Sequence, residues 1–554
     1  MNKSVMFSFF GNEKFPVEWE SEDEKKLHFW FDDAHTPHPL TPLYGSIHNA
    51  MAWEVTCTYG LSKLALPSTK GVKAKLVNGY VYPAMVPTTE EEAKKLAPIH
   101  NLVLPFYLKN VPRLWKERYE PELKRNLAYL EPKNYEKADL SELMYWLNEA
   151  IDIGFRHMCI HWLLNLTQFI GFLIYDGVYT ELIGEVPEEV RNLTLKTHAD
   201  KNMEVLKGIW MLKETIKKNR HLKKLFTKDA KEILSELKNT PEGKKFMRKL
   251  EDFLSKYGNK AVYVFEFIHP SWREDPTPVI ELIKSYLAIN YNHHAEVRKI
   301  IKERKKAVEE ALSKIKGNEE KRKFMSALKT AYALAPITPN HHFYIDQWTI
   351  VAMRRVFLKI GERLRENNVL EKAEDVFFLT LDQLKEIMSN LRAFNAKDIV
   401  RVARRTWEEQ FQLSPPPNLG TITESSANDI VKIKLWGWAL PKEKELAKNE
   451  LRGIAASPGT VKGTAKVVRS PQEFGSVEKG DILVCNLTNP AWTPLFTKIS
   501  GVVTDSGGIL SHPGILSREF KIPCVVGTVH ATKVIQSGQK IRVDGNKGIV
   551  EILG

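Results

Sequence analysis

The sequence predicts a multidomain α+β protein, in which a large and mostly α-helical region precedes a small β/α domain. Three observations predict this class. The chain has 554 residues, which is too long for one hydrophobic core. From about residue 90 to residue 405, apolar residues recur three and four positions apart, which is typical of amphipathic helices. After residue 450, short runs of Val, Ile and Thr alternate with Gly and Pro, which is typical of strands.

The helical region is expected over residues 1–405. Its clearest helical patterns cover 205–217, 282–316 and 350–367. The first part, to about residue 90, is predicted to be irregular or β, with a small hairpin over 72–82 around Asn78-Gly79. Residues 406–449 are predicted to form a linker and lead-in, because Ser414 is followed by three Pro and the stretch favours extended backbone.

The composition excludes several classes of protein. The formal net charge is +13, but the Lys residues are spread along the chain, and no zinc-finger spacing or basic stripe indicates nucleic-acid binding. The four Cys form no C-x-x-C pair, which fits a reducing cytoplasm. The most apolar run, Trp162–Tyr175, is shorter than the ~20 residues of a membrane span and contains Asn165 and Gln168, so we expect a buried helix and no membrane contact.

The domain over residues 450–554 carries the most informative motif. A strand is predicted to end near Thr504, and Gly507-Gly508 permits a tight turn. His512 then stands at the start of a helix over about 513–520, with Pro at its first position. The positive end of a helix favours a phosphate, and a largely neutral imidazole is a nucleophile near pH 7. The pattern therefore predicts that His512 accepts a phosphoryl group; the alternative is a helix cap or core histidine.

This motif resembles the phosphohistidine swivelling domain of PEP-utilising enzymes, such as PEP synthase and rifampicin phosphotransferase. The shared pattern is Gly-Gly-x-x-x-His, a helix that ends in Arg-Glu, and then Ile-Pro-x-Val-Val-Gly over 522–527. The resemblance implies that His512 is the phosphohistidine. It also implies that the surrounding loop contains Thr504, Gly507, Gly508, Ser511 and Arg518.

The helical region resembles the same group more weakly. The Pro-rich segment that begins at His35 resembles the N-terminal entry motif of rifampicin phosphotransferases, and segments 270–276 and 374–381 resemble parts of their substrate-binding domain. Gly258-Asn259-Lys260 departs from the Gly-His-Arg of many relatives. Because no ATP-grasp domain or PEP-binding barrel is found, the arrangement looks most like the larger subunit of phenylphosphate synthases.

That likeness implies a reaction scheme. A separate ATP-grasp subunit would bind ATP with Mg²⁺ or Mn²⁺ and pass the β-phosphoryl group to His512. His512 would then phosphorylate phenol or a similar aromatic alcohol. On this scheme the chain itself binds no cofactor tightly. Two alternatives stay open: a related phosphotransferase with another hydroxyl acceptor such as an antibiotic, and a non-catalytic phosphocarrier module.

The acceptor site is predicted around residues 339–347, because it needs cations for the phosphoryl oxygens and a base for the hydroxyl proton. The base or hydroxyl partner is expected at His341 or His342, and the cation at Arg354 or Arg355; the alternatives are helix caps, buried hydrogen bonds and surface ion pairs. A metal would suit the i, i+4 pair His157 and His161, but no third ligand is evident nearby, so we expect these two residues to line the substrate pocket or to form buried hydrogen bonds. The remaining predicted substrate-binding residues are Trp162, Phe343, Tyr344, Asp346, Gln347 and Trp348.

Overall fold

The protein is described here by a computed structural model. The described residues are 16–32, 35–185, 191–261, 263–288, 290–413, 415–427, 429, 449–469, 471–488, 492, 495–496, 498–505, 512–528 and 531–553. The chain divides into two compact units. Unit 1 comprises Met1–Leu182, Tyr263–His269 and Gly317–Asp429, and unit 2 comprises Ile183–Val262, Pro270–Lys316 and Ile430–Gly554. Residues 183–262 and 270–316 of the predicted helical region are thus grouped with the C-terminal residues, and the boundaries near 405 and 450 stay a prediction.

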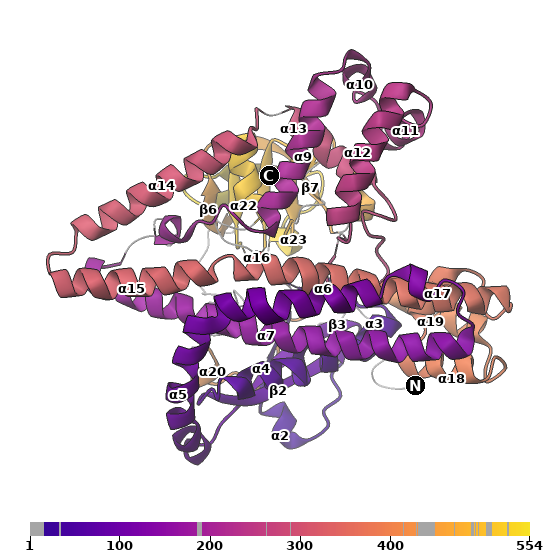
Figure 1. The fold of residues 1–554 in the computed structure, drawn as a ribbon, viewed down its shortest axis with the longest axis horizontal. Helices are drawn as coiled ribbons and strands as arrows, with labels where there is room; N and C mark the ends of the chain where they lie inside the picture. The colour runs from indigo at the N-terminus through magenta and orange to yellow at the C-terminus, as the bar shows by residue number, and fades with distance from the viewer. Residues whose placement is uncertain are drawn as a thin grey trace. The chain divides into compact units, whose positions relative to one another are not determined.

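Unit 1 is organised around the long helix α7, Leu140–Ile183 (Figure 1). Gly154 of this helix lies against Met353 of α17, and Gly171 lies against Leu334 of α15, so α7 packs closely on both neighbours. By length and composition α7 is apolar enough to cross a membrane, but 67% of its most apolar window is buried within the protein. The prediction of a buried helix over 162–175 is confirmed.

The N-terminal part of unit 1 differs from the prediction in one respect. The hairpin is present as β2, Thr69–Val77, and β3, Tyr80–Pro87, with positive φ angles at Asn78 and Gly79 in its turn. Residues 42–63, however, are almost continuously helical rather than irregular. Tertiary packing outweighs the weak periodicity there, since Leu43, Met51 and Leu61 are all buried.

The described part of the Pro-rich segment packs against the N-terminal strand. Strand β4, Asn418–Gly420, pairs antiparallel with β1, His28–Trp30. The hydroxyl of Tyr82 donates to the Pro416 carbonyl at 2.8 Å. Residues 415–420 are therefore anchored to unit 1, and any linker role falls on the residues that follow. Residues 430–448 of the predicted linker lie outside the described residues.

In the N-terminal part of unit 1, helices alternate with short strands. In chain order they are α2 Glu22–Lys25, β1, α3 Pro42–His48, η1 Asn49–Glu54, α4 Thr56–Lys63, β2, β3, α5 Glu90–Leu114, η2 Trp115–Tyr119, α6 Glu120–Tyr129, η3 Pro132–Asn134, α7, α15 Asn318–Leu334, α16 Ile337–His342, η5 Phe343–Thr349, α17 Ile350–Glu366, η6 Ala373–Phe378, α18 Leu381–Ser389, α19 Ala396–Gln410, β4 and α20 Glu424–Ala427.

The helical part of unit 2 has its own apolar core, which includes Ile209, Phe246 and Ile283. The helical pattern predicted over 282–316 is divided between two helices. The first ends at Ala288, and the side chain of Asn292 caps the second by accepting from Ala295 N. The helical elements are η4 Leu193–Leu195, α9 Lys201–Lys217, α10 Arg220–Leu225, α11 Ala230–Glu236, α12 Pro241–Tyr257, α13 Thr277–Ala288 and α14 His293–Ser313.

The C-terminal part of unit 2 is a mixed eight-stranded sheet in the order β5-β12-β11-β7-β8-β9-β10-β6. Strands β7, β8, β9 and β10 run parallel, and the other pairings are antiparallel. The runs of Val, Ile and Thr that predict strands cover 464–468, 481–485, 501–504, 524–526, 540–543 and 548–552. They correspond to β7, β8, β9, β10, β11 and β12, and the helix predicted over about 513–520 corresponds to α22. Two strands were not predicted, β5 and β6, because Glu450–Arg452 is short and Ile454–Ser457 contains two Ala. The elements are β5 Glu450–Arg452, β6 Ile454–Ser457, β7 Thr460–Val467, η7 Pro471–Ser476, β8 Ile482–Cys485, β9 Gly501–Thr504, α22 His512–Phe520, β10 Cys524–Val526, α23 Ala531–Val534, β11 Lys540–Asp544 and β12 Ile549–Leu553.

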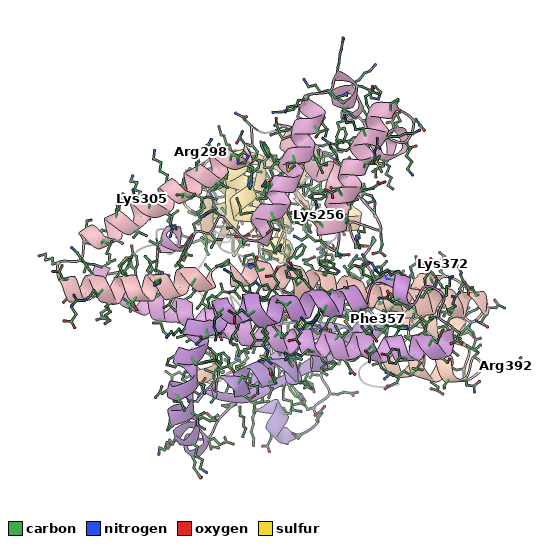
Figure 2. The ribbon with its side chains drawn as sticks, viewed as in Figure 1. Lys256, Arg298, Lys305, Phe357, Lys372 and Arg392 are labelled. Carbon is green, nitrogen blue, oxygen red and sulfur yellow. The ribbon has the colours of Figure 1, made fainter. Side chains whose placement is uncertain are left out.

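The basic residues lie mainly on the outer faces of helices. Figure 2 shows Lys305 projecting outward from α14, whereas Phe357 lies inside the helical layer of unit 1. Lys305 pairs with Glu309, and Lys95 pairs with Glu91, both at the i, i+4 spacing of an exposed helix face. This distribution agrees with a solvated surface rather than a stripe that binds nucleic acid.

Candidate active site

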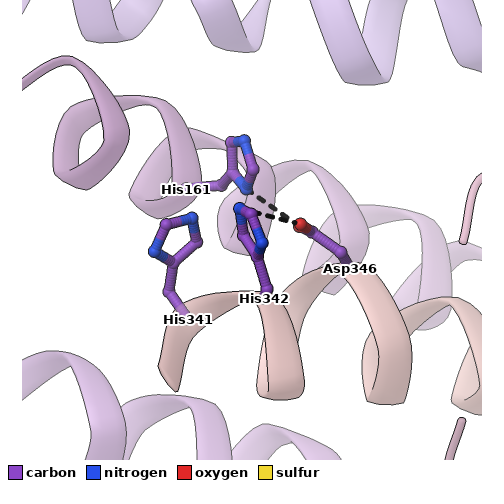
Figure 3. Close-up of side chains that lie close together, drawn as sticks. All are labelled: His161, His341, His342 and Asp346. Carbon is purple, nitrogen blue, oxygen red and sulfur yellow. Dashed lines mark ion pairs between the residues drawn. The ribbon is translucent and has the colours of Figure 1, made fainter. Parts of the chain in front are cut away.

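Three histidines and one aspartate meet inside unit 1 and form what we call the histidine cluster: His161, His341, His342 and Asp346 (Figure 3). One nitrogen or oxygen from each residue lies within 4.8 Å of the others. Asp346 is shared, because Oδ1 lies 2.8 Å from His161 Nδ1 and Oδ2 lies 3.4 Å from His342 Nε2. The structure thus brings together four of the residues that the sequence singled out.

The local backbone explains how one short segment supplies three of these side chains. His341 and His342 end α16, and Asp346 lies in the π-helical turn η5. The wider π-helical turn brings residues four and five apart onto one side, and such turns are frequent at functional sites. The fourth residue, His161, comes from α7, where α4 approaches so closely that a Cβ added at Gly60 would lie 2.8 Å from Trp162 Cβ.

The cluster is largely shielded from water, and this shifts its ionisation. His341 is fully buried, and burial lowers the pKa of this imidazole well below its ordinary value. Burial likewise lowers the pKa of His342 to about 4, although its ring remains 43% exposed. Burial opposes ionisation of Asp346, but the adjacent imidazoles of His161 and His342 hold its pKa below the ordinary value. At neutral pH we therefore expect neutral rings at His341 and His342 beside an ionised carboxylate.

A second pair, Asp32 and His35, lies near the histidine cluster and was missed as a site. His35 Nδ1 donates to Asp32 Oδ1 at 2.8 Å; the carboxylate is 2% exposed, whereas the ring is 42% exposed. A buried carboxylate that accepts from Nδ1–H fixes the tautomer in which Nε2 carries the lone pair. Electrostatic coupling joins His35 to His342. The i, i+3 spacing of Asp32 and His35 at the entry motif was the available sequence signal.

Aromatic rings fill the space between these two groups. Trp162 contacts His161 edge-on at 5.2 Å between centroids, and Trp53 contacts Trp162 at the same distance. Trp53 in turn lies 6.5 Å from His35. Trp162 thus lies beside the cluster, and its indole N–H donates to the Ala52 carbonyl. The surroundings are apolar and aromatic, with a few directed polar groups, as in small-molecule sites.

The segment Tyr263–His269 belongs to unit 1, and a hydrogen bond to its backbone explains the position of Arg354. Glu266 accepts from Thr41 N and from Thr41 Oγ1, each at 2.7 Å, and also from Phe267 N. Arg354 is buried and donates through Nη1 to the Phe267 carbonyl, and its guanidinium lies over the Phe377 ring. In this structure Arg354 therefore holds a buried backbone segment, and its predicted contact with a phosphoryl group is untested.

Several predicted acceptor-site residues lie elsewhere. His157 uses both ring nitrogens in buried hydrogen bonds, to Thr349 Oγ1 at 2.7 Å and to Asn126 at 3.1 Å, so it is not part of the cluster. Tyr344 donates to Glu120 at 3.1 Å and stacks on Trp348 at 6.0 Å between centroids. Phe343 contacts the rings of Tyr344 and Trp348, at 5.1 and 6.1 Å between centroids. Gln347 lies in η5 and Arg355 lies in α17.

His512 is the first residue of α22, which follows the carboxyl end of β9. The predicted position of this residue at a helix N-terminus is confirmed at the level of the backbone, whereas its side chain is not described. Gly507, Gly508 and Ser511 lie outside the described residues. The helix packs on strands β6, β9 and β10.

Two of the residues predicted for the loop around His512, Thr504 and Arg518, are described, and both form hydrogen bonds that hold the helix and the sheet in place. Arg518 donates through Nη1 to the Ala456 carbonyl of β6 at 2.6 Å. The Thr504 carbonyl accepts from the backbone and hydroxyl of Thr528, at 3.0 and 2.9 Å. Asp505, which was not predicted, accepts from the Thr532 backbone at 2.9 Å and from its hydroxyl. These bonds fix the end of β9 directly before the segment that leads to His512.

Comparisons with known proteins find similar domains in the helical part and in the C-terminal part of the chain. Residues 169–336 match the rifampicin phosphotransferase fourth domain, and residues 477–548 match the mobile domain of PEP-utilising enzymes. The chain is 29% identical over 546 residues to the uncharacterized phosphotransferase YvkC of Bacillus subtilis, covering 95% of this chain and 62% of that protein. It is 30% identical over 335 residues to rifampicin phosphotransferase of Bacillus cereus, covering 58% of this chain and 36% of that protein.

A third relative supports the C-terminal assignment. Phosphoenolpyruvate synthase of Aeropyrum pernix is 38% identical over 148 residues, which cover 26% of this chain and 18% of that protein. The chain spans less than two thirds of the length of each of these relatives. The two domain matches and these similar proteins show that the chain carries domains of the PEP-utilising enzyme family.

Proposed function

We propose that this chain is a phosphotransferase that takes a phosphoryl group onto His512 and passes it to a hydroxyl acceptor bound in unit 1. The observation that carries the proposal is the position of His512 at the start of α22, within the match to the PEP-utilising mobile domain. A helix N-terminus stabilises a bound phosphate, and an imidazole is a competent nucleophile. Phosphoryl transfer through a covalent histidine then needs an acceptor, a base and shielding from water.

The groups around the histidine cluster support an acceptor site there. Within the proposal, His35 takes the hydroxyl proton through Nε2, and Asp32 orients the ring and stabilises the imidazolium that forms. The ring of His35 is partly exposed, so an acceptor is able to reach it, whereas its carboxylate partner is buried. The aromatic rings of Trp53 and Trp162 offer apolar contact to a planar acceptor.

The specific acceptor we propose is phenol or a similar aromatic alcohol. A separate ATP-grasp subunit, with ATP and Mg²⁺ or Mn²⁺, is proposed as the source of the phosphoryl group. The four cysteines are free, which supports the predicted cytoplasmic location. An antibiotic is the second candidate acceptor, and the 30% identity to rifampicin phosphotransferase favours it. A non-catalytic phosphocarrier is the third alternative.

The test uses this chain alone. The protein is mixed with unlabelled phenylphosphate, isotopically labelled phenol and Mg²⁺, and label is followed into phenylphosphate. In the reverse half-reaction the P–O bond to phenol breaks, an N–P bond to His512 forms and phenol leaves with a proton; the forward step reverses this. Exchange that is lost in His512→Ala supports both the phosphohistidine and the phenol site.

The other outcomes are equally decisive. Exchange that persists in His512→Ala excludes His512 as the carrier. Exchange that occurs with a phosphorylated rifamycin and labelled rifampicin, but not with the phenol pair, assigns the antibiotic as acceptor. Phosphorylation of His512 by a donor system, with no transfer to either class of alcohol, leaves the phosphocarrier.

A further inference from the structure

The histidine cluster has the donor set of a metal site rather than that of an ordinary buried hydrogen-bond network. It combines three imidazoles and one carboxylate, taken from α7, α16 and η5 (Figure 3). The rings lie close together, with centroid distances of 4.4 Å for His341–His342 and 4.7 Å for His161–His341. Imidazole nitrogens with a carboxylate oxygen are the usual ligands of zinc and of related divalent transition metals.

Three atoms at the centre of the cluster lack hydrogen bonds. They are His161 Nδ1, His341 Nε2 and Asp346 Oδ1, all buried. His161 Nδ1 and Asp346 Oδ1 lie 2.8 Å apart as an ion pair, but their contact does not have the geometry of a regular hydrogen bond. Buried polar atoms nearly always have a hydrogen-bond partner, so three such atoms at one point call for a common explanation. A cation that all three atoms bind supplies that explanation.

The outer contacts of the rings orient their lone pairs toward the centre. His341 Nδ1 donates to the Ile337 carbonyl at 2.9 Å, so Nε2 carries the lone pair that faces the other residues. Such a hydrogen bond to the second ring nitrogen accompanies nearly every metal-binding histidine. Asn165 Nδ2 lies 3.5 Å from His161 Nε2, so metal binding through His161 Nδ1 requires the Asn165 amide to turn and accept the Nε2–H with Oδ1.

The distances fit one ion. Metal–ligand bonds of about 2.0–2.2 Å place neighbouring ligand atoms roughly 3–3.5 Å apart. The observed separations are 2.8 Å for His161 Nδ1 to Asp346 Oδ1 and 3.4 Å for His342 Nε2 to Asp346 Oδ2. All four ligand atoms lie within 4.8 Å of one another, so side-chain movements of about 1 Å are enough to bring them to the separations of a single coordination sphere. The partly exposed ring of His342 gives the ion a route from solvent.

We propose that His161, His341, His342 and Asp346 bind one divalent transition-metal ion, of the class of Zn²⁺, Co²⁺ or Mn²⁺. This differs from the expectation that the chain binds no cofactor tightly. The nitrogen-rich donor set disfavours Ca²⁺ and Mg²⁺, which prefer oxygen ligands. The metal site does not depend on phosphoryl transfer, because it is defined by the four side chains alone.

The test measures binding directly and without any phosphoryl donor. The full-length protein is stripped with a chelator, dialysed and titrated with Co²⁺, whose visible d–d absorption reports coordination by nitrogen and oxygen. We expect one Co²⁺ per chain, displaced by an equal amount of Zn²⁺. His341→Gln and Asp346→Asn each remove a ligand and should weaken Co²⁺ binding by about 100-fold or more.

The control is His157→Gln. His157 is a buried histidine on the same helix, but both its nitrogens are bonded to Thr349 and Asn126, so the Co²⁺ affinity should be unchanged. His342→Ala is the second ligand variant, because its ring is 43% exposed and its loss threatens folding least. Circular dichroism confirms that each variant is folded. Absence of stoichiometric Co²⁺ binding, or equal affinity in the wild type and in folded His342→Ala, overturns the proposal.

Discussion

Asp346 Oδ1 lies 2.8 Å from His161 Nδ1, and this contact joins the π-helical turn η5 to the middle of α7. The same carboxylate reaches His342 with its other oxygen. One buried charge thus fixes the relative positions of two helices that are far apart in the sequence. Because each of these helices is also tightly packed, small changes in helix spacing near the cluster should be measurable as losses of stability.

The close approach of α4 to α7 at Gly60 gives the first prediction. A Cβ at Gly60 would lie 2.8 Å from Trp162 Cβ and 3.0 Å from the Trp162 carbonyl carbon, so Gly60→Ala must push the helices apart. We expect this substitution to reduce the free energy of unfolding by about 1–3 kcal/mol, measured by urea denaturation.

Gly177→Ala is the matched control for this prediction. Gly177 lies on α7 and is exposed, and a Cβ there meets nothing within 4 Å. The substitution should stabilise the helix by about 0.5–1 kcal/mol, because Ala has the higher helix propensity. If Gly60→Ala is as stable as Gly177→Ala, the close approach of α4 to α7 is wrong.

The second prediction concerns the buried carboxylate of Glu266. Thr41→Val removes the hydroxyl that donates to Glu266 Oε1 at 2.7 Å but preserves the shape of the side chain. A hydrogen bond to a buried acid of this kind contributes about 1.5–3 kcal/mol, so the unfolding free energy should fall by a similar amount. Ser62→Ala, which removes an exposed hydroxyl, should change it by less than about 0.5 kcal/mol. Equal effects of the two substitutions would contradict the buried contact.

The sequence predicted local features better than contacts between distant elements. The strands after residue 450 and the helix that begins at His512 follow from Gly and Pro punctuation and from β-branched runs, which are local signals. The i, i+4 rule paired His157 with His161, but the structure pairs His161 with Asp346 and turns His157 toward Thr349. Contacts of this kind depend on how α7 packs against η5, and no periodicity within one segment encodes that packing. The π-helical turn that aligns His341 with Asp346 also has no recognised sequence signature.

The third prediction tests the Asp32–His35 pair in the exchange assay described above. His35→Gln removes the proposed base, and we expect the exchange rate to fall by about 10²–10⁴-fold. Asp32→Asn keeps the size of the side chain but loses the charge that orients and stabilises the ring, so it should also reduce the rate. His221→Gln changes a histidine of unit 2 whose ring nitrogen lies 3.3 Å from Thr240 Oγ1, and should leave the rate unchanged. Full exchange in His35→Gln would exclude His35 as the base.

The fourth prediction follows from the buried imidazole of His157. Burial lowers the pKa of His157 to about 3, whereas an unfolded chain has a histidine pKa near ~6.5. Below pH ~6.5 the unfolded state therefore binds a proton that the folded state does not, and the stability falls as the pH is lowered toward the folded value. At pH ~5 this one residue should cost about 2 kcal/mol relative to pH ~7.

This pH dependence is checked by measuring urea unfolding of the wild type and His157→Gln at both pH values. The variant lacks the titrating ring, so its loss of stability between pH ~7 and pH ~5 should be smaller by about 2 kcal/mol. Thr349→Val is the control, because it removes the 2.7 Å hydrogen bond but keeps the buried imidazole. The unfolding free energy of Thr349→Val should be lower than that of the wild type at both pH values. It should still fall as steeply between pH ~7 and pH ~5 as it does in the wild type. An equally steep dependence in His157→Gln would mean that His157 is already protonated in the folded protein, in conflict with its burial.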